Sequence, residues 1–309
     1  MTTMVSINAL DLYGAGSEED ERRYAGVEAL LRELDADIVA VQELRVPGPA
    51  EHRKAQARGA AVRLRRLAEA VGRRCDTGAR AEDLLLAVGG GVHHVGLLWH
   101  EDSVAPVPGR VQRFGRAAGM WHSLVTAVFD LGDGVLARAG SVHLPPFDQN
   151  WAVQDTSQIL RAMHGDDLPG FVGGDFNNIG ATKVRDPSTG ELVFYDADPY
   201  AGLPWQAHHV YQLDADGDVD RRAAHRLEAP HLGRLQDCAI LTDTPWTPTT
   251  GHHPDDRHPP RRLDRWYATH RAPGRAVRRY QAVAAARVGG LTDHCPVIID
   301  VDPAAMTGS

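Results

Sequence analysis

The sequence predicts an α/β protein whose core is one large system of β-sheets. Apolar runs of strand length recur along the chain, and stretches whose apolar residues repeat at helical spacing lie between several of them. Several of these runs adjoin short acidic or amide motifs, which contain Glu43, Asp175 with Asn177, Asp264 and Asp293. A carboxylate is costly to bury unless it is paired or binds a metal, so these residues predict a functional site at the rim of a sheet.

Length and composition fit one large domain. The chain has 309 residues, of which 43% are apolar, and this is enough for a sizeable core. We expect a single domain over residues 1–302, with a loop-rich substrate rim at about 183–256 and a flexible C-terminal tail at 303–309. The 41 acidic and 33 basic residues give a formal charge of −8, which argues against a global electrostatic footprint for nucleic acid.

Cysteine usage and hydropathy bear on the compartment. The cysteines Cys75, Cys238 and Cys295 are far apart and odd in number, which supports neither a disulfide framework nor a zinc module. The N-terminal residues show no basic region followed by a long apolar stretch, and no run approaches the roughly 20 apolar residues that span a bilayer. We therefore expect a cytoplasmic protein that has no membrane partner.

The first quarter of the chain reads as strand, helix, strand and helix. A short strand at 4–10 precedes a helix that opens at Ser17, where Asp20 completes the spacing of a capping box. A strand at 38–41 follows and ends just before Glu43. A second helix is expected over 50–71, with its arginines facing solvent.

The middle of the chain is richer in strands. Three are predicted, at 92–99, 121–130 and 135–143. A glycine-containing turn at 132–134 joins the last two as a hairpin. A helix is expected over 148–164, and the buried strand at 171–175 contains Gly173 and Gly174, which let the backbone bend closely. From 182 to 262 the apolar runs weaken, which predicts long loops and hairpins on one rim.

Two further patterns suggest metal sites, but each has a simpler interpretation. Residues 214–218 resemble a calcium loop, yet the Gly and Glu that an EF-hand requires are absent, so a hairpin turn is expected. The pairs His93-His94, His208-His209 and His252-His253 lack the spacing of a zinc hydrolase helix. We expect them to be surface or loop histidines.

The order of the polar motifs along the chain is the most specific signal. The motifs are Asn8, Gln42-Glu43, His143-Leu144, the segment 174–177, the segment 262–264 and the segment 292–297. In this order they resemble the endonuclease/exonuclease/phosphatase superfamily, which includes DNase I, abasic endonucleases, inositol polyphosphate 5-phosphatases, neutral sphingomyelinases and deadenylases. The resemblance spans residues 4 to about 301. It implies a DNase I-like four-layer α/β sandwich, in which two packed mixed sheets are flanked by helices.

The resemblance implies a metal site built on Glu43. Its hard anionic oxygens suit Mg²⁺, with Mn²⁺ as the alternative, and would hold the ion against a phosphate. Asn8 supports that site in the family, although a turn-forming Asn is the other interpretation. Asp293 is expected as a further carboxylate of the metal site or as a residue that positions His294.

Asp175 and Asn177 are expected to act on the phosphate and the water. They alternate by two, so an extended backbone places both side chains on one face. The acid can orient or activate water, and the amide can hold a phosphate oxygen. His294 is the second candidate for general base or for direct phosphate contact, and the sequence leaves open which of Asp175 and His294 takes the proton.

Two further catalytic roles follow from the resemblance. Asp264 would hydrogen-bond His294 and fix its tautomer, unless it forms an ordinary ion pair with Arg262 or Arg265. His143 should point at the scissile phosphate and stabilise charge on its oxygens. Abasic endonucleases usually carry Tyr at that position, so His143 argues mildly against that branch.

The chain also departs from the family pattern. Many members carry an acidic or amide residue where this chain has His93-His94, which puts the support of His143 from that side in doubt. The stretch 257–287 contains nine arginines and one acid, Asp264, so the site is expected to be cationic unless these arginines face solvent from a strand at 277–288.

These residues favour a metal-dependent phosphoesterase. A small phosphorylated metabolite or nucleotide is the expected substrate, because the segment 196–256 is acidic and histidine-rich. A DNA or RNA endo- or exonuclease is the alternative. A second alternative is a member repurposed as a non-hydrolytic biosynthetic enzyme or binding protein. The oligomeric state is not predicted.

Overall fold

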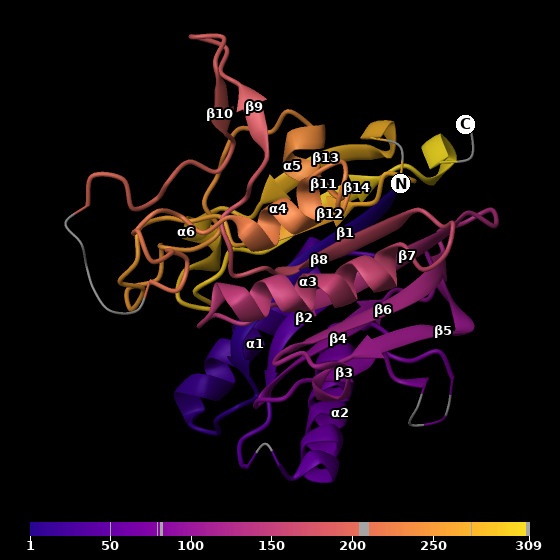
Figure 1. The fold of residues 1–309 in the computed structure, drawn as a ribbon. Coiled ribbons are helices and arrows are strands. Elements are labelled where there is room, and N and C mark those ends of the chain that lie inside the picture. The colour runs from indigo at the N-terminus through magenta and orange to yellow at the C-terminus, as the bar shows by residue number, and fades with distance from the viewer. Residues whose placement is uncertain (50, 79, 81–82, 204–209, 273, 307–309) are drawn as a thin grey trace.

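Two six-stranded mixed sheets packed face to face form the centre of the protein (Figure 1). The computed structural model describes residues 1–49, 51–78, 80, 83–203, 210–272 and 274–306. In order across the sheet, the first consists of β13 (Val277–Ala282), β14 (Val297–Val301), β1 (Thr2–Leu12), β2 (Ile38–Arg45), β4 (His93–Trp99) and β3 (Leu86–Val88). The second consists of β11 (Gln236–Asp237), β12 (Asp264–Ala268), β8 (Gly170–Asp175), β7 (Leu136–His143), β6 (Ser123–Asp130) and β5 (Ala105–Phe114).

Each sheet contains one parallel pair of strands near its centre. These pairs are β1 with β2 and β7 with β8, and the other neighbours run antiparallel. Because β1 pairs with β14, Thr2 lies opposite Val301, and the first and last strands of the chain are neighbours (Figure 1). The parallel pairs place the ends of β2 and β8 at the rim, where polar residues follow the apolar runs.

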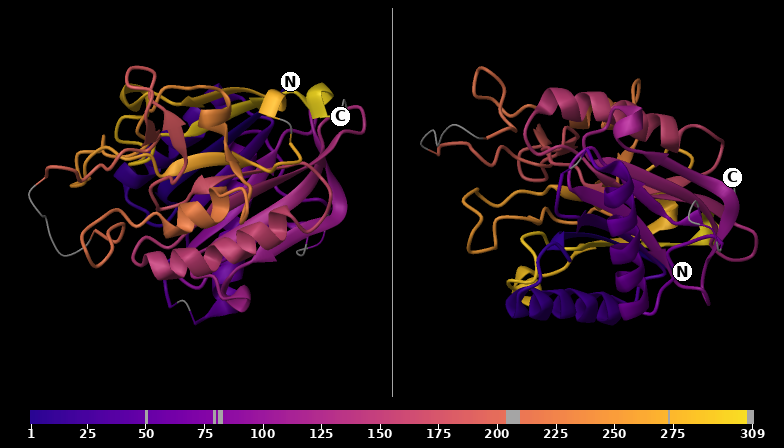
Figure 2. Two further views of the ribbon diagram at one scale, coloured as in Figure 1. Left: turned by 45° about the horizontal axis from the view of Figure 1, so that its top comes forward. Right: turned by 90° about the horizontal axis from the view of Figure 1, so that it is seen from below.

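Helices cover the outer face of each sheet, as the views in Figure 2 show. The outer face of the first sheet packs against α1 (Glu18–Leu34) and α2 (Arg53–Ala70). The outer face of the second packs against α3 (Gln149–Met163) and α4 (Arg222–Glu228). A third core lies between the sheets and includes Phe129, Phe171 and Trp266. The predicted four-layer α/β sandwich is confirmed.

Local sequence signals explain most element boundaries. At the start of α1, Ser17 and Asp20 form the predicted capping box, which stabilises a helix by about 1 kcal/mol. The strand predicted at 277–288 is shorter than expected. It ends at Ala282, and the one-turn helix α6 (Ala285–Val288) follows it. Strand β5 was not predicted. It is an edge strand in which a single residue, Phe114, is buried, so it carries no apolar run.

The segment from 182 to 262 contains loops, turns and short elements. A two-stranded hairpin of β9 (Lys183–Arg185) and β10 (Leu192–Phe194) projects from the body (Figure 1). The one-turn helix α5 (Cys238–Leu241) follows β11. The calcium-like sequence is a turn, as predicted, in which Asp214 Oδ1 accepts hydrogen bonds from the backbone N–H groups of Asp216 and Asp218. The pair His208-His209 lies outside the described residues.

Three further observations complete the fold. No described helix is long and apolar enough to cross a membrane. All three cysteines are buried with free thiols. Residues Pro303–Met306 of the expected tail form a 3₁₀ helix, and 307–309 lie outside the described residues.

Candidate active site

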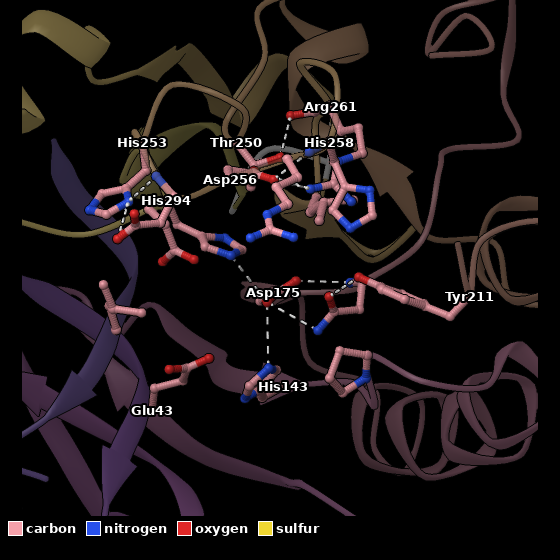
Figure 3. Close-up of a pocket in the computed structure, with 17 residues that line it drawn as sticks. Glu43, His143, Asp175, Tyr211, Thr250, His253, Asp256, His258, Arg261 and His294 are labelled. Carbon is pink, nitrogen blue, oxygen red and sulfur yellow. Dashed lines mark hydrogen bonds and ion pairs between the residues drawn. The ribbon is translucent and has the colours of Figure 1, made fainter. Parts of the chain in front are cut away.

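A cleft of about 470 Å³ opens at the rim where strands of both sheets end (Figure 3). Six of the eight predicted site residues line this cleft, namely Glu43, His143, Asp175, Asn177, Asp293 and His294. The other two lie directly behind them. Asn8 contacts both Glu43 and Asp175, and Asp264 contacts His294. The structure therefore brings all eight predicted residues together.

Sheet register explains why three of these residues meet. Strand β8 lies between β7 and β12, and Asp175 pairs with His143 on one side and with Asp264 on the other. The three side chains thus stand in one row across the second sheet. The close approach of the strands requires glycine at 174, because a Cβ there would collide with the carbonyl oxygen of Val142.

Glu43 is displayed by an irregularity in β2. The pairing register shifts between Val41 and Leu44, and Glu43 itself has a φ of 61°, in the left-handed region. Two donors hold its carboxylate: Asn8 Nδ2 lies 3.1 Å from Oε1, and the backbone N of Asp11 lies 2.9 Å from Oε2. The strand break therefore turns Glu43 into the cleft instead of continuing the alternation of the sheet.

Asp175 is the most heavily contacted carboxylate of the cleft. Its Oδ1 accepts a 2.9 Å hydrogen bond from the backbone N of Asn177, and its Oδ2 accepts from Asn177 Nδ2 and Asn8 Nδ2, both at 3.1 Å. Asn177 has a φ of 49°, so it leaves the strand direction and folds back over Asp175. Tyr211 donates a 2.6 Å hydrogen bond to Asn177 Oδ1 and thereby holds the amide nitrogen towards Asp175.

His294 joins the two sheets at the cleft. Thr292 Oγ1 donates to the carbonyl of Asn8 at 2.7 Å and accepts from the backbone N of His294 at 3.2 Å, which anchors this loop to β1. His294 Nδ1 lies 2.8 Å from Asp264 Oδ2, and its Nε2 lies 3.8 Å from Asp175 Oδ2. Asp264 therefore pairs with His294, whereas the alternative partners Arg262 and Arg265 bind other carboxylates.

The charges of these groups follow from their burial and pairing. Burial would lower the pKa of His294, but the carboxylates of Asp264 and Asp175 outweigh it and hold that pKa well above 6.5. Burial would raise the pKa of Asp175, but the neighbouring His294 and His143 outweigh it and lower that pKa. At neutral pH the cleft therefore contains an Asp175 carboxylate facing a His294 imidazolium.

Two further histidines, His122 and His93, lie near the ring of His143. Its Nε2 lies 3.4 Å from Asp175 Oδ2, while its buried Nδ1 has no hydrogen-bond partner among the described residues. The ring of His122 lies 3.9 Å from that of His143, and burial lowers the pKa of His122 well below 6.5. His93 lies farther away, with its ring centroid 6.5 Å from that of His143.

The interpretation of His93 and His94 as surface or loop residues is wrong. Both lie on β4, and His94 is fully buried, with Nε2 3.1 Å from Gln56 Oε1. Burial lowers the pKa of His94 to about 4. His93 Nε2 instead forms a 2.6 Å ion pair with Asp11 Oδ1 beside the cleft. Pairing of β4 with β2 and β3 buries His94, and the spacing of zinc motifs contains no information on that pairing.

Two groups of side chains among the described residues are close enough to share a cation. One group is Asp11, Glu43 and His93, and the other is Asp175, Asp264 and His294, with ligand atoms within 4.8 Å of one another in each. In the second group His294 is already hydrogen-bonded to Asp264. In the first group Asp11 pairs with Arg45 at 3.1 Å as well as with His93, which leaves Glu43 as the carboxylate that faces the cleft.

The cleft fits a hard divalent cation. Asp293 lines it with a buried Oδ1 that has no hydrogen-bond partner among the described residues, and Glu43 lines it from the first sheet. Carboxylate oxygens are the donors that Mg²⁺ and Mn²⁺ prefer. Asn8 presents its amide nitrogen to Glu43, and its Oδ1 accepts from the backbone N of Leu10 at 3.2 Å. In this orientation Asn8 positions Glu43.

A loop from the weakly patterned segment forms the opposite wall of the cleft. Its lining side chains are Thr250, His253, Asp255, Asp256, Arg257, His258 and Arg261. Together with Tyr211 they were not among the predicted site residues. No apolar run or catalytic motif marks them. The signals near them were the histidine-rich composition of this segment, the His252-His253 pair and the arginine-rich stretch that begins at 257.

The site carries less positive charge than the arginine count of the 257–287 stretch indicated. Only Arg257 and Arg261 of its nine arginines line the cleft. Arg262 and Arg265 are buried in ion pairs with Asp196 and Asp237, and most of the others pair with surface carboxylates. The extra positive charge is therefore largely structural.

Comparisons with known proteins place the chain among phosphoesterase-type folds. The model of the endonuclease/exonuclease/phosphatase family matches residues 10–294. An endonuclease/exonuclease/phosphatase from Bacteroides vulgatus superposes with a TM-score of 0.60 at 14% identity, over 97% of this chain and 98% of that chain. No curated protein sequence matches the chain closely enough to count as a relative.

Two similar structures belong to proteins with more specific names. A mannosyl-6-phosphatase from Bacteroides thetaiotaomicron has a TM-score of 0.54 at 15% identity, over 98% of this chain and all (100%) of that chain. The human nocturnin catalytic domain with a bound sulfate anion has a TM-score of 0.53 at 15% identity, over 97% of this chain and 94% of that chain. At such identities the likeness shows the fold alone.

Proposed function

Because the chain belongs to the endonuclease/exonuclease/phosphatase family, we propose that it is a divalent-metal-dependent phosphoesterase that hydrolyses a phosphomonoester or phosphodiester of a small phosphorylated metabolite or nucleotide. One observation carries the proposal. The Asp175 carboxylate lies between His143 and His294 in a cleft that Glu43 and Asp293 also line. Carboxylates for a cation and donors for a phosphate thus face one small space.

Glu43 and Asp293 are the residues proposed to hold Mg²⁺, with Mn²⁺ as the alternative. When bound, such an ion supplies positive charge that offsets the charge developing on the phosphate oxygens. Asn8 orients Glu43 through its amide nitrogen. The unpartnered buried oxygen of Asp293 supports its assignment, because buried polar atoms in native proteins normally have a partner.

The charge states favour different roles for Asp175 and His294. A lowered pKa keeps Asp175 ionised, so its carboxylate is proposed to accept the proton of the attacking water. A raised pKa keeps His294 protonated, so its Nε2–H is proposed to donate to a phosphate oxygen. His143 is proposed to contact a remaining phosphate oxygen. The amide nitrogen of Asn177 already donates to Asp175 Oδ2 at 3.1 Å and to the carbonyl of Leu144 at 2.9 Å, so Asn177 is proposed to position Asp175.

The shape and charge of the cleft support a small substrate. The loop that contains His253 and Arg261 forms one wall of the cleft, and the cleft has a volume of about 470 Å³. A double-stranded nucleic acid would need a long basic groove, and the arginines near this site are mostly paired. One of the similar structures is that of a sugar phosphatase, which agrees with a small substrate. The buried free thiols agree with the proposed cytoplasmic location.

A substrate panel tests the proposal. Release of phosphate or nucleotide would be followed for wild type, His294→Ala and the control His253→Ala with nucleic acids, nucleotides, and sugar and inositol phosphates. His253 lines the cleft, but among the described residues its partner is Asp255, at 3.9 Å. We expect turnover with Mg²⁺ or Mn²⁺, none with EDTA, and loss in His294→Ala only. No turnover of any substrate by wild type would favour a repurposed or binding protein.

A further inference from the structure

Three exposed aromatic side chains contact one another. Trp121, Phe147 and Trp151 are 38%, 46% and 43% exposed, and each pair of ring centroids is 5.4 Å apart. Neither indole N–H has a hydrogen-bond partner within the described part of the chain. We call these three residues the aromatic triad.

Other exposed aromatics of the described chain have a local explanation that the triad lacks. Phe194 is covered by the cations of Lys183 and Arg221, and the Trp246 indole donates a 3.0 Å hydrogen bond to Asp196. No cation lies over a ring of the triad in the part of the chain that the structure describes. Exposing three large rings together costs free energy, and such patches usually mark a binding surface.

The backbone connects each ring of the triad to the cleft. Phe147 follows Pro146, which lines the cleft. Trp121 precedes His122, whose ring centroid lies 3.9 Å from that of His143. Trp151 stands on the first turns of α3, close to Gln149, whose Nε2 donates to the carbonyl of Asn177 at 3.0 Å. The segments that carry the triad therefore adjoin residues on the His143 side of the cleft.

We propose that the aromatic triad is a stacking platform for the base of a nucleotide whose phosphate occupies the cleft. This inference rests on the proposed function and narrows its substrate class to nucleotides. Aromatic rings stack on any nucleobase, because every base has a π face. The three side chains offer no carboxylate or amide to accept hydrogen bonds from sugar hydroxyls, so a phosphorylated sugar would gain less from them.

Binding in the absence of turnover tests the platform. Adenosine 5′-monophosphate, ribose 5-phosphate and inorganic phosphate would be titrated into the full chain with EDTA, with tryptophan fluorescence and calorimetry as readouts. Stacking contributes about 1–3 kcal/mol per base, which corresponds to roughly 5- to 150-fold in affinity. We expect the nucleotide to quench fluorescence and to bind at least fivefold more tightly than ribose 5-phosphate.

Variants assign the effect to the triad. Trp121→Leu and Trp151→Leu are expected to weaken nucleotide binding at least fivefold and to leave binding of inorganic phosphate unchanged, whereas Trp246→Leu retains wild-type affinity. Unchanged thermal unfolding temperatures would show that the variants are folded. Equal affinity for the nucleotide and ribose 5-phosphate, or unchanged nucleotide binding in both triad variants, would overturn the platform. Hydrolysis of sugar phosphates with no nucleotide preference would overturn the platform and leave the phosphoesterase proposal intact.

Discussion

Replacing Asp264 with asparagine separates the charge of the Asp264–His294 pair from its geometry. Asp264 Oδ2 lies 2.8 Å from His294 Nδ1, and an asparagine oxygen can accept the same hydrogen bond. The substitution removes the negative charge of the carboxylate. Two unit charges about 4 Å apart interact by about 4 kcal/mol at an effective dielectric constant of about 20. The pKa of His294 should therefore fall towards its ordinary value of 6.5.

The activity of Asp264→Asn should depend on pH in a specific way. Removing one donor to transition-state charge typically lowers kcat about 10²–10³-fold, and we expect a loss of that size at pH 8, where the variant imidazole is neutral. At pH 6 the imidazole regains its proton, so the loss should shrink. The assay is the kcat profile from pH 6 to pH 9 for wild type, Asp264→Asn and the control Asp255→Asn, which changes an exposed carboxylate of the same cleft.

The stability of the protein should depend on pH through the same Asp264–His294 pair. A histidine whose folded pKa is raised contributes stability that is fully present below pH 6.5 and is lost as pH rises through the folded pKa. The unfolding temperature of Asp264→Asn should therefore lie farther below wild type at pH 6 than at pH 10. An activity deficit that is equal at every pH, together with an unchanged His294 signal in an NMR titration, would refute the assignment of His294 as a protonated donor.

Three further changes test other parts of the site. Glu43→Gln should weaken Mn²⁺ binding at least tenfold in calorimetry, because it removes an anionic oxygen donor; wild-type affinity would exclude Glu43 as a ligand. Tyr211→Phe should lower kcat about 5- to 10-fold, since it removes a hydrogen bond of about 1 kcal/mol that orients the Asn177 amide. The control Tyr200→Phe removes a hydroxyl that contacts Gln212 and should leave kcat unchanged. Equal effects of the two changes would contradict a positioning role for Tyr211. Burial raises the pKa of Asp155 to about 7, and an acid with a raised folded pKa loses stability as pH rises from about 4 through 7. Asp155→Asn should therefore raise the unfolding temperature at pH 9 and change it little at pH 4. Equal unfolding temperatures of variant and wild type at pH 9 would show that burial of the ionised Asp155 carboxylate does not destabilise the fold.

The parts of the site that lie at strand ends could be predicted from the sequence. Glu43 and Asp175 each follow an apolar run, and strand register then brings His143, Asp175 and Asp264 into one row. The four-layer arrangement itself came from the order of the motifs. Apolar periodicity alone indicates strands and helices but not how two sheets pack.

The parts that depend on pairing between distant segments could not be predicted. Tyr211 reaches Asn177 from a loop with no apolar pattern, and its role is visible only in the folded chain. Counting arginines overestimated the charge of the site, because Arg262 finds its partners Asp196 and Asp237 far away in the sequence. His94 was interpreted as a surface or loop residue, because the pairing of β4 with β2 and β3 and the contact with Gln56 of α2 are visible only in the folded chain.

The most direct test of the proposed chemistry is hydrolysis of a phosphate ester in ¹⁸O-labelled water, followed by ³¹P NMR. For wild type with Mg²⁺ we predict free phosphate, or a phosphomonoester, that carries one ¹⁸O from the solvent. We predict no such product with EDTA or in Asp175→Asn. Turnover that persists at the wild-type rate in Asp175→Asn, or product without ¹⁸O, would contradict attack by a water molecule that Asp175 activates.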